Sequence, residues 1–161
     1  MKKKLLLVSL CAIVAFGFAA CGSKVSEVEK INFEGSEQEL QYTGWSVSDW
    51  SLVEDDEESL EPFILVYFNF TNKDSTGYSV QDCYGITVYQ EGVEQDSSVE
   101  YLNADSESYR AMDNFFNSVK GGGTLPIAYS CYVSNMSGEI EVEVEEYETG
   151  KTQNMIIDLS K

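Results

Sequence analysis

The cysteine at position 21 is the residue of this chain to which a specific covalent chemistry can be assigned. It ends the run Phe18-Ala19-Ala20-Cys21, which follows a long segment without charges. Phe18-Ala19-Ala20-Cys21 resembles a lipobox, the motif whose thiol receives a diacylglycerol and becomes the N-terminus after cleavage. We therefore predict that Cys21 is the site of lipidation.

The first 20 residues have the layout of a secretory signal. Lys2, Lys3 and Lys4 give a positive start, the apolar run 5–15 follows, and small residues precede the cleavage point. We predict a lipoprotein signal peptide over 1–20 and a protein held on the extracytoplasmic face of the cell membrane. An ordinary signal peptide with a chance cysteine, or an uncleaved anchor, is the alternative. Two acyl chains suffice for stable anchoring, and no other apolar run nears the roughly 20 residues of a membrane span.

Familiar catalytic constellations are missing from the sequence. The chain has no histidine, which removes the commonest general base and the commonest transition-metal ligand. It has no nucleophile elbow, no metal-ligand spacing and no phosphate-binding loop. We predict no catalytic, metal-binding or cofactor-binding residues and a protein that is not an enzyme. An Asp/Glu pair could in principle hydrolyse glycosides, so a carboxylate-based hydrolase stays as an alternative.

Two acidic runs, 54–58 and 139–148, raise the question of calcium. The segment starting at Asn72 matches the opening of an EF-hand loop, but its twelfth position is Cys83 instead of glutamate. Asn103-x-Asp105-x-Glu107 lacks both the glycine and the closing glutamate. Carboxylates at alternate positions are typical of a solvated strand face, and we expect no calcium site.

The two cysteines Cys83 and Cys131 could form a disulfide. Export favours oxidation. Side-chain alternation opposes it, because Cys131 shares a face with apolar residues and Cys83 does not, unless a bulge at Gly85 resets the register. The sequence leaves this possible disulfide open.

The charge of the mature chain excludes two kinds of partner. Beyond residue 20 there are seven basic and 28 acidic residues, a net charge of 7 − 28 = −21. Nucleic-acid binding needs basic neutralisation of phosphates, and a peripheral grip on anionic lipid needs a polybasic patch. We therefore expect no nucleic acid and no membrane contact except through the lipid.

Hydrophobic alternation predicts an all-β domain. Strand patterns cover 40–50, 63–70, 78–90, 125–133, 140–144 and 155–159, with a hairpin at Glu91-Gly92. The apolar run 63–70 is typical of a central strand covered on both sides, and only 109–112 suggests a helical turn. About seven strands predict an immunoglobulin-like antiparallel sandwich over 37–161. Residues 21–36 are predicted as the lipidated N-terminus and tether, with a first edge strand near Ile31 and Phe33.

Three segments carry a resemblance to a known family. They are Phe68-Asn69-Phe70-Thr71-Asn72, Val88-Tyr89-Gln90-Glu91-Gly92-Val93-Glu94, and the glycine-rich turn before Leu125-Pro126-Ile127-Ala128-Tyr129. Over about 39–159 the chain resembles the DUF5067 lipoproteins, which are related to DUF4352 domains. The resemblance implies an immunoglobulin-like domain of an exported protein, and it implies no activity and no functional residues.

These observations predict a non-catalytic binding module at the cell envelope. Its partner would be a protein, a peptide or a glycan of the envelope. Trp45, Trp50 and the ten tyrosines could supply an aromatic platform, although aromatic residues also build cores. A passive structural spacer is the remaining alternative.

Overall fold

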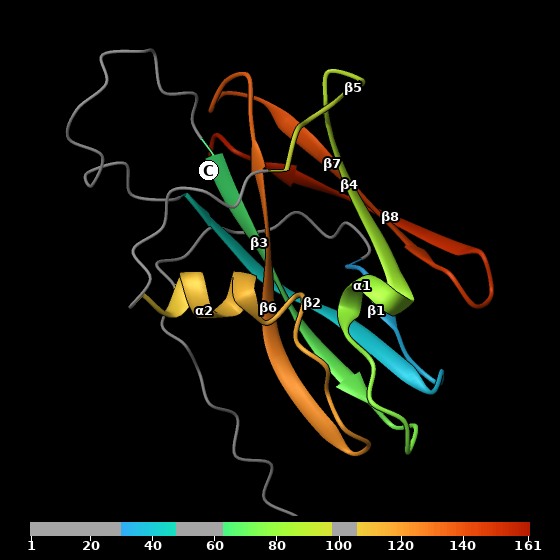
Figure 1. Cartoon of the computed structure of the whole chain (residues 1–161). Coiled ribbons are helices and arrows are strands. Elements are labelled where there is room, and N and C mark those ends of the chain that lie inside the picture. Colours follow the sequence, from blue (N-terminus) through green and yellow to red (C-terminus); the bar gives the residue numbers. More distant parts are fainter. Residues whose placement is uncertain (1–29, 48–62, 98–105) are drawn as a thin grey trace, which may run out of the picture.

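The protein is a sandwich of two four-stranded antiparallel sheets (Figure 1). The computed structural model describes residues 30–47, 63–97 and 106–161. One sheet has the strand order β1-β2-β3-β6 and the other β5-β4-β7-β8. The strands are β1 Asn32–Phe33, β2 Gln38–Val47, β3 Phe63–Asn72, β4 Tyr84–Gln90, β5 Val93–Glu94, β6 Gly123–Tyr132, β7 Glu139–Glu146 and β8 Lys151–Asp158. The predicted all-β sandwich is confirmed, with eight strands in place of about seven.

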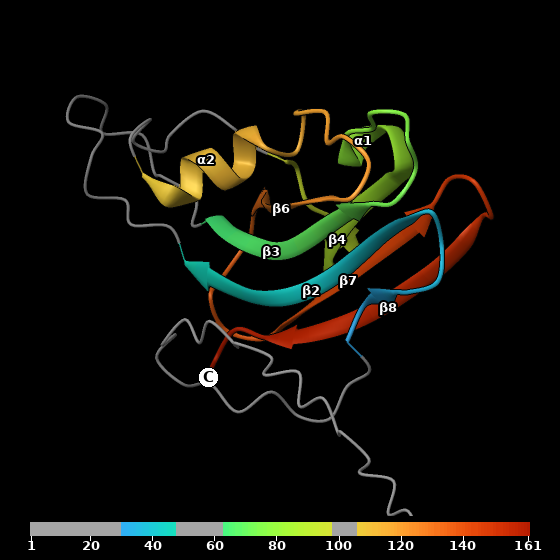
Figure 2. The same ribbon diagram turned by 90° about the horizontal axis from the view of Figure 1, so that it is seen from below.

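Strand β3 is the centre of the first sheet and is covered on both faces. One face carries Ile64, Val66, Phe68 and Phe70 into the main core between the sheets. The other face carries Phe63 and Leu65, which pack with Ala111 and Met112 of helix α2 (Glu107–Asp113). Figure 2 shows α2 lying on the outer side of this sheet. The continuous apolar run of β3 thus follows from its burial on two sides, as predicted.

Strand β7 shows the opposite pattern, with one face in the core and one toward solvent. Ile140, Val142 and Val144 are fully buried, whereas Glu139 and Glu145 are exposed. Its neighbour β4 turns into β5 through Glu91 and Gly92, which have φ angles of 53° and 78°. Positive φ at both central residues is typical of the tight turns that join antiparallel strands. The predicted hairpin is confirmed.

The segment Tyr78–Gln90 differs from the single strand that we predicted. A four-residue helix, α1 (Val80–Cys83), comes first, and β4 begins only at Tyr84. The carboxylate of Asp82 accepts a hydrogen bond from the backbone N–H of Ser79 at 2.9 Å, which stabilises the start of the helix. This local capping overrides the strand pattern over these four residues.

The ordered domain extends into the segment that we assigned to the tether. Ile31 and Phe33 are each only 1% exposed and belong to the main core, so the first edge strand is confirmed. Cys21 and the signal peptide lie outside the described residues, as do Trp50, the acidic run 54–58, Asn103 and Asp105. No helix within 30–47, 63–97 or 106–161 has the length and apolar character to cross a membrane.

Candidate functional site

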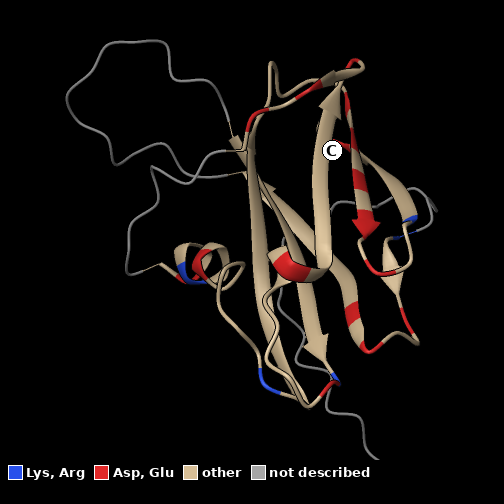
Figure 3. Cartoon of the chain, turned by 45° about the vertical axis from the view of Figure 1, so that its right-hand side comes forward, with Lys and Arg blue, Asp and Glu red and all other residues tan. Residues whose placement is uncertain are grey.

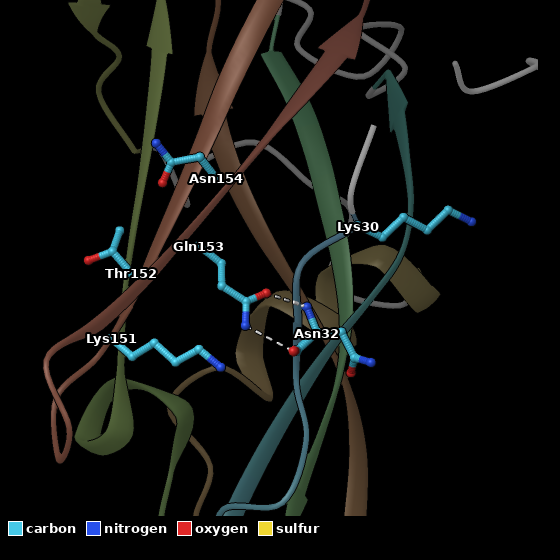
Figure 4. A pocket seen from close by; sticks show the side chains of 6 residues that line it. All are labelled: Lys30, Asn32, Lys151, Thr152, Gln153 and Asn154. Carbon is cyan, nitrogen blue, oxygen red and sulfur yellow. Dashed lines mark hydrogen bonds between the residues drawn. The ribbon is translucent and has the colours of Figure 1, made fainter. Parts of the chain in front are cut away.

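A polar depression of about 560 Å³ lies where the edge strands of the two sheets, β1 and β8, approach each other (Figure 4). Its volume falls within the range of small-molecule sites, about 300–1,000 Å³. The lining consists of three carboxamides, one hydroxyl and two ammonium groups, from Lys30, Asn32, Lys151, Thr152, Gln153 and Asn154. None of these six side chains is a carboxylate or a large apolar group, so the depression differs in chemistry from the acidic surface around it.

The side chain of Gln153 joins the two strands across the depression. Its Nε2 donates to the backbone oxygen of Asn32 and its Oε1 accepts from the backbone nitrogen of Asn32, both at 2.9 Å. The amide therefore occupies the same two backbone groups that a neighbouring strand would occupy. This bridge holds β1 against β8 and fixes the floor of the depression.

The two lysines extend in the same general direction but end on opposite sides of β1 (Figure 4). Lys151 extends from β8 toward β1, and its Nζ lies 5.5 Å from the centre of the Phe33 ring, a cation–π contact. Lys30 extends away from β8 on the far side of β1. A ligand that contacts both ammonium groups would therefore have to extend across β1.

The charge of the depression contrasts with the rest of the domain. Figure 3 shows acidic residues on strands and turns throughout the domain and few basic ones. Among the described residues, the ion pairs are Lys73 with Glu39 and Lys161 with Asp158, and neither involves Lys30 or Lys151. One lining residue contacts a carboxylate, because Glu141 accepts from Asn154 Nδ2 at 2.7 Å. Within the described part of the chain, neither Lys30 nor Lys151 is neutralised by an ion pair.

One buried polar atom belongs to a lining residue. Asn32 Oδ1 is shielded from solvent and accepts no hydrogen bond. An unpaired buried acceptor costs about 1–3 kcal/mol, and native proteins keep few of them. Because this oxygen is shielded from solvent, it is a local cost to stability and not a contact point for a ligand in the depression.

Cys83 and Cys131 are free thiols, so the possible disulfide is not formed in this structure. Cys131 pairs with Ile64 near one end of β3, whereas Tyr84, which follows Cys83, packs on Phe70 with ring centres 6.3 Å apart. Six residues of strand span about 20 Å, and a disulfide needs Cα atoms within about 7 Å. Burial raises the pKa of Cys131 to about 12. Burial raises the pKa of Cys83 to about 11, and the charges of nearby carboxylates add to this shift.

A pair of carboxylates that could resemble a hydrolase centre is found at Glu37 and Asp74. Their side chains share a hydrogen bond, which raises the pKa of Glu37, while the backbone N–H of Thr76 is the main cause that lowers the pKa of Asp74. Glu37 is exposed and Asp74 is half-buried at the surface, and neither lines the β1–β8 depression. This arrangement provides no enclosed site for a sugar between two carboxylates, which glycoside hydrolysis requires.

The loop that resembles an EF-hand opening uses its oxygen atoms internally. Asn72 Oδ1 accepts from the Asp74 nitrogen at 3.0 Å, and Asp74 Oδ1 accepts from the Thr76 nitrogen at 2.7 Å. Asn72 is fully buried and donates to the backbone oxygen of Val119. In the part of the chain that the structure describes, no three His, Cys, Asp or Glu side chains gather as metal ligands.

Of the two tryptophans, the structure describes Trp45, which is half-buried and packs against the main core. It lines no part of the depression. The residues that do line it received no role in the sequence analysis. Lys30 and Lys151 are separated by about 120 positions, and nothing in their local sequence indicates that they share a surface.

Comparison with known proteins finds the same fold in two solved bacterial structures. A candidate lipoprotein from Staphylococcus aureus has a similar structure, with a TM-score of 0.59 at 15% identity, over 84% of this chain and 94% of that one. A candidate lipoprotein from Bacillus subtilis, YcdA, gives 0.51 at 14% identity over 83% of this chain and 40% of that one. No curated protein sequence matches. The model of the domain of unknown function DUF5067 matches residues 19–146, and the chain therefore belongs to the DUF5067 family.

Proposed function

We propose that this protein is a lipid-anchored, non-catalytic binding module on the outer side of the cell membrane. The observation that carries the binding role is the polar depression between β1 and β8, which is free of carboxylates in a strongly acidic protein. The lipobox-like run ending at Cys21 and the lipoprotein descriptions of the two similar structures support the anchor.

The position of the depression agrees with this arrangement. Lys30 lies nine residues after Cys21, and nine residues of extended chain reach at most about 30 Å. An anchored Cys21 would therefore keep the β1–β8 edge close to the membrane and within reach of envelope material. A hydrolase is less well supported, because the Glu37–Asp74 pair lies at the surface and in no enclosed site.

The anchor is tested by replacing Cys21 with alanine and following incorporation of a labelled fatty acid in a bacterial host. Cys11→Ala is the matched control, because Cys11 lies inside the predicted signal peptide. We expect labelling to disappear in the first variant and to remain in the second. Labelling that survives the loss of Cys21 would remove the anchor from the proposal.

The binding role is tested with the full chain, purified in mild detergent and immobilised. Fractionated envelope proteins and envelope glycans are passed over it separately. Retention of a defined protein or glycan at micromolar concentration supports a binding module. Retention of neither would favour a passive spacer and would contradict the proposed function.

A further inference from the structure

We propose that the depression between β1 and β8 binds an acidic carbohydrate that carries more than one negative charge. The inference rests on the proposed binding function and names the chemical class of its ligand. Its evidence is the set of side chains in the depression, the placement of the two lysines, and their absence from the ion pairs found among the described residues.

The polar lining favours a ligand rich in hydroxyl groups. Each carboxamide of Gln153 and Asn154 can donate and accept hydrogen bonds, and the hydroxyl of Thr152 can do both. Sugar hydroxyls have the same dual character. After the bridge to Asn32, Gln153 keeps one N–H and one lone pair for further bonds.

The lysines restrict the ligand to an anionic carbohydrate. Lys151 points across the seam between the strands and is held over the Phe33 ring, so its ammonium group is already positioned when a ligand arrives. Neither it nor Lys30 takes part in either described ion pair. At physiological ionic strength charges more than about 8 Å apart are largely screened, so carboxylates remote from the depression repel a bound anion only weakly. Glu141, whose carboxylate accepts from Asn154 Nδ2 at 2.7 Å, is a nearby negative charge that the two lysines must outweigh.

The ammonium groups of Lys30 and Lys151 lie on opposite sides of β1, and this placement favours a ligand with repeated charges. A monosaccharide with one anionic group can reach Lys151 alone. A short polymer that extends from the depression across β1 can place a second anionic group near Lys30. The anionic group can be a carboxylate or a phosphate ester, because an ammonium group binds both.

The test uses the full chain, labelled with ¹⁵N-lysine and purified in mild detergent. The chemical shifts of the Lys30 and Lys151 backbone amides report binding at the depression between β1 and β8. Those of Lys73 and Lys120 serve as internal references. The probes are galacturonate, its trimer, glucose 6-phosphate and neutral glucose. We expect the trimer to bind more tightly than galacturonate, with shifts at Lys30 and Lys151 only, and glucose to bind more weakly than every charged probe.

Charge variants then separate the two lysines. Lys151→Gln should weaken both galacturonate and its trimer about tenfold, the usual effect of one charge-assisted hydrogen bond. Lys30→Gln should weaken only the trimer, and Lys120→Gln, a remote exposed lysine, should change neither. Thermal unfolding of each variant shows that the fold is intact.

The pattern of probes that bind identifies the anionic group or rejects the carbohydrate ligand. Binding of glucose 6-phosphate without galacturonate assigns the anionic group as phosphate, and the reverse assigns it as carboxylate. Binding of glucose as tight as that of the charged probes, or no effect of Lys151→Gln, would overturn the proposal. If no sugar binds while an envelope protein is retained by the full chain, the acidic carbohydrate is rejected and the binding function stands.

Discussion

The side-chain amide of Gln153 pairs with both backbone groups of Asn32, two hydrogen bonds of 2.9 Å between residues 121 positions apart. A second glutamine makes a similar bridge elsewhere in the sandwich. Gln90 donates to the backbone oxygen of Asn135 at 2.9 Å and accepts from its nitrogen at 3.2 Å. In both cases a carboxamide side chain satisfies backbone groups that have no strand beside them.

The Gln153 bridge should contribute measurably to stability. Strand β1 has two residues and pairs with β2 at only two positions, so it depends on other contacts. Gln153→Ala leaves the Asn32 backbone without these partners, and we expect a loss of about 1–3 kcal/mol in the free energy of unfolding. Urea denaturation of the chain without residues 1–21 measures it.

Asn154→Ala is the control for this prediction, because Asn154 is the next residue of β8 and is exposed. Its loss should cost no more than about 0.5 kcal/mol. Equal denaturation midpoints for the two variants would show that the bridge contributes little to the stability of the edge.

The glycine at position 121 should be intolerant of any side chain. A Cβ at Gly121 would lie 2.2 Å from the backbone oxygen of Asp74, and neither backbone segment can rotate out of the way. We expect Gly121→Ala to reduce the free energy of unfolding by about 1–3 kcal/mol, as overpacking commonly does. Gly44→Ala is the matched control, because a Cβ there would meet nothing within 4 Å. A Gly121→Ala protein as stable as the control would contradict this close approach.

The sequence predicted the parts of the fold that depend on burial of alternate residues. In β7 the inward positions Ile140, Val142 and Val144 are apolar and the outward positions are glutamates, so period-2 alternation defined both faces. In β3 apolar residues on both faces indicated the cover that α2 and the second sheet provide. Alternation and apolar runs are local patterns along the chain, so a single sequence is enough to detect them.

Other features depend on local hydrogen bonds or on contacts between distant segments. The pattern Ser79-x-x-Asp82 is a helix-start motif that could have predicted α1, but the strand pattern around it obscured the motif. The candidate site was not predictable in this way. Lys30 and Asn32 meet the first residues of β8 only because β1 and β8 are edge strands on the same side of the sandwich.

The two thiols should show the chemistry of separate, poorly ionised cysteines. Cys131 is fully buried with a pKa of about 12, and Cys83 has a pKa of about 11. A thiol reagent at pH 8 should therefore react slowly with the native protein and should modify both cysteines after unfolding. A reducing agent should leave the denaturation midpoint unchanged. A midpoint that falls on reduction would indicate a disulfide and contradict the separation of the two residues.

The burial of Cys131 makes the free energy of unfolding depend on pH in the alkaline range. In the folded protein the pKa of Cys131 is raised from 9.0 to about 12, so its contribution is fully present below pH 9. It is lost as the pH rises from 9 toward 12, because only the unfolded chain ionises over this range. Cys131→Val, which keeps an apolar side chain of similar size, should show a shallower decline of stability across this interval. An identical decline in both proteins would mean that other groups cause it.

Tyr89 should report the field of the β7 glutamates. Partial burial raises its pKa most, and the charges of Glu143, Glu94 and Glu141 raise it further. Tyr89 pairs with Glu141 across the strands and lies two positions from Thr87, the partner of Glu143. Glu143→Gln removes one negative charge, and we expect the pKa of Tyr89 to fall toward its ordinary value of about 10. Titration of ¹³C-labelled tyrosine rings by NMR measures the pKa of Tyr89.

The control Glu107→Gln removes a carboxylate from α2, on the outer side of the other sheet, and should leave the pKa of Tyr89 unchanged. Equal shifts from the two variants would mean that Tyr89 senses the net charge of the whole protein, instead of the carboxylates beside it.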